Sequence, residues 1–206
     1  MSATLEAQVV LDNLDSSICC PFFNKAGTLH VVFSEIGQIG VVREDSGEVD
    51  EVHNTDGEPS CAAFSQEGSL YITDYTHGAV LVATDPTAST QTNKDFRSER
   101  QDLVVSVYED KPLKGPGSLA FDSNGNIFFT DSGPFGETGI HNATGSLFTI
   151  TSGVSTKILK PIVLEKLARP SGIAISPNGK FIYVAEMMTN RILRFFENPT
   201  GNKLTL

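Results

Sequence analysis

The sequence has no apolar run of about 18 residues, the length that a membrane-spanning helix needs, and its first residues contain no basic segment followed by an apolar one. These absences argue against a transmembrane helix and against a secretory signal peptide. We therefore expect a soluble, cytoplasmic protein that has no membrane partner.

Basic residues are also few. Fifteen Lys and Arg residues stand against 25 Asp and Glu residues, and the formal net charge is −10. A chain with this balance repels the phosphate backbone of nucleic acids. Nucleic acid is therefore not an expected partner.

Only three cysteines occur, with Cys19 and Cys20 adjacent and Cys61 far along the chain. An odd number without regular spacing does not match the disulfide framework of secreted domains, and it favours reduced thiols. Because no Cys-x-x-Cys pair accompanies paired histidines, we do not expect a zinc site.

An internal repeat is what the sequence does contain, and a turn glycine marks each of its four copies: Gly27, Gly68, Gly125 and Gly179. An apolar stretch precedes each glycine, and a short segment rich in β-branched and aromatic residues follows it, for example LYITD and IFFTD. These patterns predict two strands joined by a tight turn. The four copies cover residues 21–35, 59–74, 116–131 and 170–186.

Further strands are expected after each copy. Third strands are predicted at residues 37–44, 78–85, 145–150 and 190–196, and weaker fourth strands at 48–53, 102–109 and 161–167. The prolines that begin the copies lie 38, 57 and 54 residues apart, close to the length of one four-stranded propeller blade. We expect an all-β domain over residues 1–206, a β-propeller with blades near 15–55, 56–110, 111–168 and 169–206. Residues 5–14 could add an outer strand that closes the ring against the last blade.

Two copies resemble a known family. Residues 170–196, PSGIAISPNGKFIYVAEMMTNRILRFF, resemble a blade of the senescence marker protein/gluconolactonase and strictosidine synthase-like proteins, and residues 111–136 resemble the corresponding gluconolactonase blade. These relatives are six-bladed propellers that include metal-dependent lactonases, organophosphate hydrolases and the metal-free strictosidine synthase. Since only four blades are recognisable here, three explanations stay open: a chain truncated at its C-terminus, a ring closed by a partner or a second copy through open blade edges, and a four-bladed ring.

The resemblance also implies where a metal would bind. In the lactonases of this family, the position eight residues before the turn glycine supplies ligands, commonly Glu in the first blade and Asn or Asp in others. These channel positions hold Cys19, Ser60, Gly117 and Ser171 here. Calcium takes six or more oxygens, with charge from carboxylates, and none of the four residues offers a carboxylate or amide. We therefore expect no metal cofactor.

Acidic residues at the ends of the predicted second strands offer a fallback metal site: Glu35, Asp74, Asp131 and Glu186. A repeated acid in this position more often accepts N–H bonds from the turn that follows it, and we favour that structural role. A Ca²⁺ site that uses Asp74, Asp131 and Glu186 is the alternative.

The longest loop inside the repeats, residues 132–145, is rich in glycine. Because loops on a rigid scaffold often contact ligands, Phe135, Glu137 and His141 are candidate contact residues. Two function classes stay open. We expect a binding module for a small molecule or a protein, without metal-dependent catalysis; the alternative is a calcium-dependent hydrolase of the lactonase or esterase type.

Overall fold

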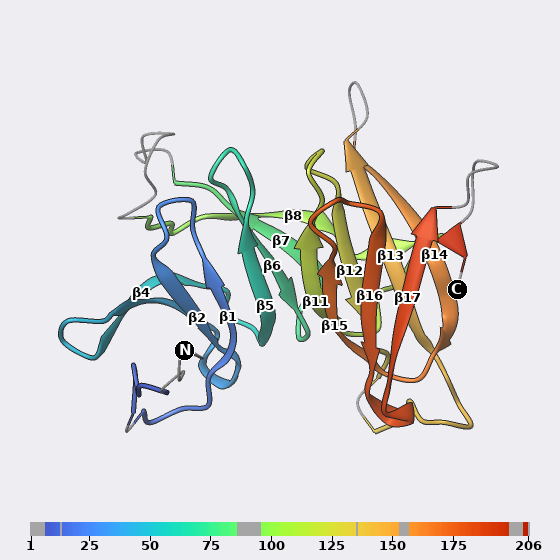
Figure 1. Ribbon diagram of the computed structural model, residues 1–206, viewed down its shortest axis with the longest axis horizontal. Helices are drawn as coiled ribbons and strands as arrows, with labels where there is room; N and C mark the ends of the chain where they lie inside the picture. Colours follow the sequence, from blue (N-terminus) through green and yellow to red (C-terminus); the bar gives the residue numbers. More distant parts are fainter. Residues whose placement is uncertain are drawn as a thin grey trace, which may run out of the picture.

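A computed structural model of the chain describes residues 7–12, 14–85, 96–134, 136–152, 157–197 and 204–205. Within them, four sheets of four antiparallel strands follow one another along the chain, together with one two-stranded ribbon. The four sheets stand side by side in chain order, as propeller blades do (Figure 1). The predicted all-β propeller architecture with four blades is confirmed.

The strands of each blade pair in chain order. Blade 1 contains β1 (Cys19–Phe23), β2 (Leu29–Phe33), β3 (Gln38–Arg43) and β4 (Glu48–Asn54). Blade 2 contains β5 (Pro59–Phe64), β6 (Leu70–Asp74), β7 (Ala79–Ala83) and β8 (Gln101–Val105). Blade 3 contains β11 (Pro116–Phe121), β12 (Ile127–Asp131), β13 (Gly145–Ser152) and β14 (Lys157–Leu167). Blade 4 contains β15 (Pro170–Ile175), β16 (Phe181–Glu186), β17 (Arg191–Glu197) and β18 (Leu204–Thr205).

Three short elements connect these strands. The 3-10 turns η1 (Ser34–Ile36) and η3 (Met187–Thr189) follow β2 and β16, and the ribbon pairs β9 (Val107–Tyr108) with β10 (Lys111–Pro112). The predicted fourth strand at 102–109 is therefore divided, with only its first part in blade 2. The division arises because Glu109 and Asp110 both adopt a positive φ, of 48° and 61°, and so form a tight turn between β9 and β10.

The four turn glycines have the backbone conformation that the repeat predicts. Their φ angles are 79°, 90°, 79° and 69° in chain order, in the left-handed region that favours glycine. At Gly27, Gly125 and Gly179, an added Cβ would meet no atom within 4 Å. At these three turns, backbone conformation is therefore the reason for glycine, rather than lack of space.

Three apolar layers between neighbouring blades form the core. Alternation along the strands builds them: in β6, Leu70 and Ile72 face blade 1, whereas Tyr71 faces blade 3. The layer between blades 2 and 3 includes Phe129, and the layer between blades 3 and 4 includes Val184, both fully buried.

A fourth apolar cluster covers the face of blade 1 that points away from blade 2. Leu11 and Leu14 pack there against Val31, Phe33 and Val42. The described part of residues 5–14 forms no strand, so the expected closing strand is wrong for those residues. Its apolar side chains instead cover blade 1, because that face would otherwise expose Val31 and Phe33 to water.

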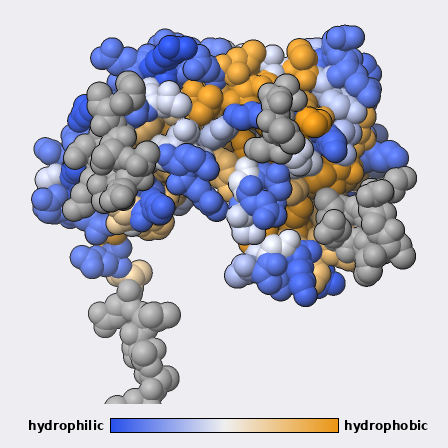
Figure 2. All heavy atoms as spheres, turned by 90° about the horizontal axis from the view of Figure 1, so that it is seen from above, coloured by the Kyte–Doolittle hydropathy of each residue, from blue (hydrophilic) through white to orange (hydrophobic). Residues whose placement is uncertain are grey.

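The two ends of the row of blades differ in surface character. Ile192 of β17 is 66% exposed, whereas Val31 of blade 1 is buried. Seen from above, hydrophobic side chains lie at the surface mainly in the right half of the molecule, over blades 3 and 4 (Figure 2). In the part of the chain that the structure describes, no helix is long and apolar enough to cross a membrane.

Candidate functional site

The inner strands of the four blades, β1, β5, β11 and β15, lie next to one another and share the wall of one cavity of about 640 Å³. The remaining wall comes from the segments that follow the second strand of each blade and from the residues directly before the inner strands of blades 2, 3 and 4. Figure 2 shows that the molecule is hollowed between its left and right halves. Because the repeat places the same strand end of each blade at this cavity, equivalent positions in different blades come together there.

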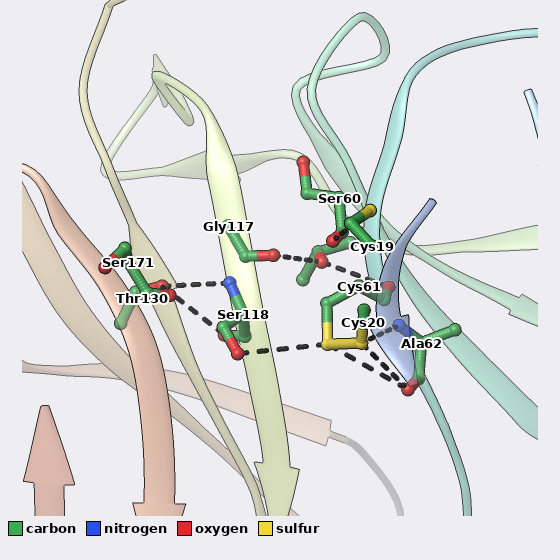
Figure 3. Close-up of a disulfide and its surroundings, with 10 residues drawn as sticks. Cys19, Cys20, Ser60, Cys61, Ala62, Gly117, Ser118, Thr130 and Ser171 are labelled. Carbon is green, nitrogen blue, oxygen red and sulfur yellow. Dashed lines mark hydrogen bonds between the residues drawn. A yellow bond between two sulfur atoms is a disulfide. The ribbon is translucent and has the colours of Figure 1, made fainter. Parts of the chain in front are cut away.

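Three of the four channel positions line the cavity: Ser60, Gly117 and Ser171. In blade 1 the wall takes the next residue, Cys20, while the Cys19 thiol lies 3.6 Å from the carbonyl oxygen of Ser60 (Figure 3). Cys20 has a positive φ of 45°, which changes the direction of β1 between the two cysteines. The structure therefore brings the channel positions of blades 2, 3 and 4 to one site and adds Cys20 to them.

A side chain at Gly117 would require the neighbouring hydroxyls to move. A Cβ at this residue would lie 2.7 Å from Ser132 Oγ and 3.0 Å from Thr130 Oγ1. The channel position of blade 3 is therefore filled by the hydroxyls of its own second strand and of the loop after it. An Asn or Asp ligand could not replace this glycine without moving them.

Threonine hydroxyls connect the second strand of one blade to the inner strand of the next. Thr73 of blade 2 donates to the carbonyl oxygen of Gly117 at 2.7 Å. Thr130 of blade 3, which lies beside Ser171 in Figure 3, donates to the carbonyl oxygen of Ser171 at 3.2 Å. Both threonines are fully buried. These bonds set the relative positions of the channel residues, since each one holds the backbone of a channel position in the next blade.

A disulfide takes this role between blades 1 and 2. It joins Cys20 to Cys61, whose Cα atoms lie 5.2 Å apart, and Cys19 is free (Figure 3). The expectation of three reduced thiols is therefore wrong. The repeat itself held the signal, because both half-cystines lie seven residues before their turn glycine and equivalent positions on neighbouring inner strands are adjacent.

The remaining thiol is a poor nucleophile. Burial raises the pKa of Cys19 above its ordinary value, which keeps it protonated at neutral pH. Because the thiolate is the reactive form, thiol catalysis has no support at this site.

The three fallback acids are buried, and their carboxylates accept hydrogen bonds from backbone N–H groups. Asp74 accepts bonds from the N–H groups of Glu58, at 3.3 Å, and of His77, at 2.9 Å. Asp131 accepts the N–H of Lys114 at 3.0 Å, and Glu186 accepts the N–H of Ala168 at 2.8 Å. Only Asp74 caps the turn that follows it in this way. All three fix the segment that leads into the inner strand of their own blade.

Glu35, the fourth acid of the predicted set, has a different place. Blade 1 ends its second strand at Phe33, and Glu35 lies beyond it in η1, exposed. The predicted equivalence is therefore wrong for Glu35, because Phe33 occupies the position that Asp74 and Asp131 hold, six residues after the turn glycine. Phe33 packs instead into the apolar cluster with Leu11 and Leu14.

Two of the buried acids have pKa values shifted in opposite directions. Burial raises the pKa of Asp131 above its usual value, and the bonds from the Lys114 and Gly115 amides offset this only in part. Burial also acts to raise the pKa of Glu186, but bonds from Thr189, Ala168 and Arg191 outweigh it and hold the pKa below its usual value. Glu186 is therefore stable as a carboxylate, whereas ionised Asp131 carries a cost.

The side chains around the cavity are not a suitable set of ligands for a hard divalent cation. Within the described ranges, no group of three or more His, Cys, Asp or Glu side chains is arranged to hold a metal. The three fallback acids point into their own blades, where backbone N–H groups and side-chain donors use their oxygens. Serine hydroxyls and one glycine at the channel positions do not supply the carboxylate charge that calcium requires.

The candidate contact loop meets the cavity at its beginning. Ser132 and Gly133 belong to the cavity wall. Glu137 and His141 are exposed further along the loop, and Phe135 lies outside the described residues. A role in ligand contact for these three residues stays a prediction.

Three residues at the rim of the cavity, two of which are charged, were not identified from the sequence. Glu58, Gly115 and Arg169 each stand directly before the proline that begins an inner strand, and all three line the cavity. The ring of Tyr75 lies against Gly115, where an added Cβ would be 2.7 Å from Tyr75 Cε2. The constant position of these residues before Pro59, Pro116 and Pro170 was the available signal.

The fold and this cavity define a propeller with a site at the ends of its inner strands. The model of the SMP-30/Gluconolactonase/LRE-like region matches residues 20–205. The chain therefore belongs to this family, as its resemblance predicted. It is also 29% identical over 154 residues to the protein STRICTOSIDINE SYNTHASE-LIKE 13 of Arabidopsis thaliana, in an alignment that covers 69% of this chain and 34% of that relative.

Solved structures of the same superfamily have a similar fold. A gluconolactonase from Xanthomonas campestris matches with a TM-score of 0.72 and 22% identity, over 92% of this chain and 60% of that one. Regucalcin from Agrobacterium tumefaciens, a calcium-binding protein, matches with a TM-score of 0.66 and 17% identity, over 95% and 59%. The chain thus spans about a third of the curated relative and three fifths of these structures. At these identities the structural likeness concerns the fold alone.

Proposed function

We propose that this chain is a binding module that holds a small molecule in the cavity at the ends of its inner strands, without a metal. The observation that carries the proposal is the set of channel positions in that wall: Ser60, Gly117 and Ser171, two hydroxyls and a glycine. Hydroxyls can donate and accept hydrogen bonds. Such a wall suits a neutral or polar organic ligand better than a bare cation.

The size and lining of the cavity support this proposal. Its volume of about 640 Å³ falls within the range of small-molecule sites, roughly 300–1,000 Å³. Tyr75 and Met187 add apolar surface to the wall, and threonine bonds and a disulfide hold its strands together. A pre-formed wall of mixed polarity lowers the entropy cost of binding.

A calcium-dependent lactonase is the second candidate. Family membership favours it, because the relatives include a gluconolactonase and a calcium-binding regucalcin. The two candidates differ in one requirement, since only the lactonase needs a divalent cation in the cavity.

The experiment compares the purified chain with and without Ca²⁺ in thermal unfolding, and assays hydrolysis of glucono-1,5-lactone on the same sample. A ligand that binds only the folded state raises the melting temperature. The binding-module proposal expects no shift with Ca²⁺ and no hydrolysis above the spontaneous rate. A calcium-dependent rise together with hydrolysis would establish the lactonase instead.

A gain-of-function variant makes a negative calcium result informative. Ser60→Asp combined with Ser171→Asn restores ligand-type side chains at two positions that converge on the cavity, and we expect it to gain calcium affinity by calorimetry. Ser123→Asp, at the exposed β11–β12 turn, adds the same charge away from the cavity and should not. Equal calcium binding by the two variants would contradict the convergence of the channel positions.

Self-association through open blade edges stays part of the proposal. The exposed Ile192 on blade 4 offers apolar surface to a second copy or to a protein partner. Light scattering measures the mass in solution, and we expect a fraction above one chain that falls with Ile192→Lys. A single-chain mass at all concentrations would exclude self-association.

A further inference from the structure

Three equivalent residues form a rim around the cavity, and two of them carry opposite charges. Glu58 precedes Pro59 of blade 2, and Arg169 precedes Pro170 of blade 4. Between them, blade 3 has Gly115. One repeat position thus brings an acidic residue to one side of the cavity wall and a basic residue to the other.

Buried acids hold the backbone at each rim position. Asp74 accepts the N–H of Glu58 itself, and the carbonyl oxygen of Glu58 accepts the N–H of Tyr75 at 2.9 Å. At the other side, Glu186 accepts the N–H of Ala168, the residue before Arg169. The carbonyl oxygen of Arg169 accepts the N–H of Met187 at 3.0 Å. Both charged side chains therefore start from fixed backbone.

The backbone at Arg169 is unusual for an arginine. Its φ is 57°, in the left-handed region, while the equivalent Gly115 has a φ of 154°. Glycine adopts such conformations without steric cost, whereas other residues are strained there. Local folding would be served better by glycine, and the strained turn places Arg169 at the cavity wall, which supports a role for its side chain there.

The surface between the two charges is aromatic and apolar. Tyr75 lies against Gly115 in the middle of the rim, and Met187, 52% exposed, lines the same cavity. Because one blade separates Glu58 from Arg169, and packed sheets lie about 10 Å apart, groups that meet both charges must sit at opposite ends of a ligand. A compact ion with both charges on one carbon would reach only one of them.

On the basis of the proposed binding function, we propose that the cavity selects an extended zwitterion, such as a short peptide with free ends. Arg169 binds its carboxylate, Glu58 binds its ammonium group, and Tyr75 and Met187 contact the apolar middle. A guanidinium pairs with a carboxylate through two parallel hydrogen bonds, so Arg169 sets the orientation of the ligand.

The probe is the tripeptide Ala-Phe-Ala in four forms: with both ends free, N-acetylated, C-amidated and blocked at both ends. Calorimetry measures affinity, and shifts of the Gly115 and Gly133 amides in NMR spectra report binding at the cavity. We expect the free peptide to bind most tightly, with about a tenfold loss for each blocked end, since charge-assisted bonds are worth at least that factor.

Variants connect each loss to one residue. Arg169→Gln should abolish the preference for a free carboxylate and leave the preference for a free ammonium, whereas Glu58→Gln should do the reverse. Lys166→Gln and Glu67→Gln, exposed residues near these elements, change net charge equally and should leave both preferences intact. Arg169→Lys should keep part of the carboxylate preference, and serves if Arg169→Gln fails to fold.

The outcomes separate the two proposals. If the doubly blocked peptide binds at the cavity as tightly as the free one, the zwitterion proposal is overturned while the binding function stands. If blocked ends matter but the Lys166→Gln control has the same effect as Arg169→Gln, Arg169 is not the carboxylate site and the proposal fails. If none of the four forms binds, the zwitterion proposal fails; failure of the binding function itself is decided separately, by the calcium and lactone experiment.

Discussion

Blade 1 and blade 3 have the same four strands and the same turn glycine, but different interactions join each of them to the next blade. Blade 3 uses the Thr130 hydroxyl, which donates to Ser171. Blade 1 uses the disulfide between Cys20 and Cys61. The repeat thus conserves the geometry of a blade, whereas the chemistry that joins two blades varies from one junction to the next.

A second difference concerns the end of the second strand. Asp131 fixes the segment that leads into β11, while blade 1 has Phe33 at the equivalent position. Blade 1 therefore lacks the buried acid, and its apolar replacement is covered by residues from the N-terminal segment. The blades that hold rim residues by a buried acid are those that place Glu58, Gly115 and Arg169 at the cavity.

The largest effect is expected from the junction between blades 1 and 2. The disulfide closes a loop with a sequence separation of 41 residues, for which chain entropy predicts a contribution of about 4 kcal/mol. Cys20→Ala combined with Cys61→Ala should therefore lower the free energy of unfolding by up to that amount, measured by urea denaturation. Cys19→Ala is the control. Equal stability of the oxidised protein and the double variant would contradict the prediction.

The same disulfide bears on location. Disulfides persist mainly in oxidising compartments, so the expected cytoplasmic location stays a prediction. Labelling of free thiols in freshly lysed cells under denaturing conditions, which expose the Cys19 thiol, would test both points. One labelled cysteine is expected if the bond is present in vivo, and three if it is not.

The next largest loss of stability is expected when a buried acid is removed. Asp74→Ala removes the acceptor of the Thr55 hydroxyl and of the Glu58 and His77 amides, and leaves buried donors unsatisfied. We expect a loss of about 3 kcal/mol in unfolding free energy. Glu35→Ala, the exposed acid of blade 1, should change it by less than about 0.5 kcal/mol. Similar losses from the two variants would refute the distinction between them.

The threonine junction should contribute less. Thr130→Val removes the bond to Ser171 and the acceptor for the Ser118 amide, at a cost of about 1–2 kcal/mol. Thr149 is a matched control, because its buried hydroxyl has no hydrogen-bond partner among the described residues. Thr149→Val should be neutral or stabilising in the same chemical denaturation. A larger loss of unfolding free energy in Thr149→Val than in Thr130→Val would show that the Thr130 bond contributes nothing.

The smallest expected effect is the change in the pH dependence of stability when Glu186 or Asp131 is replaced by its amide. The lowered pKa of Glu186 stabilises the fold above the unfolded-state pKa, and this contribution is lost as pH falls through the folded-state pKa. The raised pKa of Asp131 acts in the opposite sense, since its cost grows as pH rises through the folded-state value. The destabilisation by Glu186→Gln should therefore shrink in acid, while Asp131→Asn should gain relative to wild type towards neutral pH. If the unfolding free energies of both variants ran parallel to that of wild type from pH 3 to 7, both predicted pKa directions would be contradicted.

Much of the fold could be predicted from the sequence because its signals are local. Turn glycines and alternating apolar residues predicted the first, second and third strands of each blade, with boundary shifts of one or two residues. The prediction was less accurate where a weaker pattern met a stronger local turn, as at Glu109 and Asp110. The N-terminal segment was misplaced because its apolar residues suit a strand and a packed segment equally well.

The candidate site was predictable only in part. The channel positions Ser60, Gly117 and Ser171 come together as the repeat register implies. The disulfide and the rim charges were missed because each depends on which equivalent residues meet across blades. Cys20 and Cys61 are 41 residues apart, and Glu58 and Arg169 lie in different copies of the repeat.

The sequence by itself therefore determined the blade as a unit, since hydrophobic alternation and positive-φ glycines act within a few residues. It also determined that the channel positions lack carboxylates. Only the tertiary structure decided which side chains join one blade to the next, that the buried acids accept bonds from backbone N–H groups, and that an acidic and a basic residue line one cavity. These contacts are made between segments far apart in the chain, and their energies depend on burial and distance, which exist only once the blades have packed.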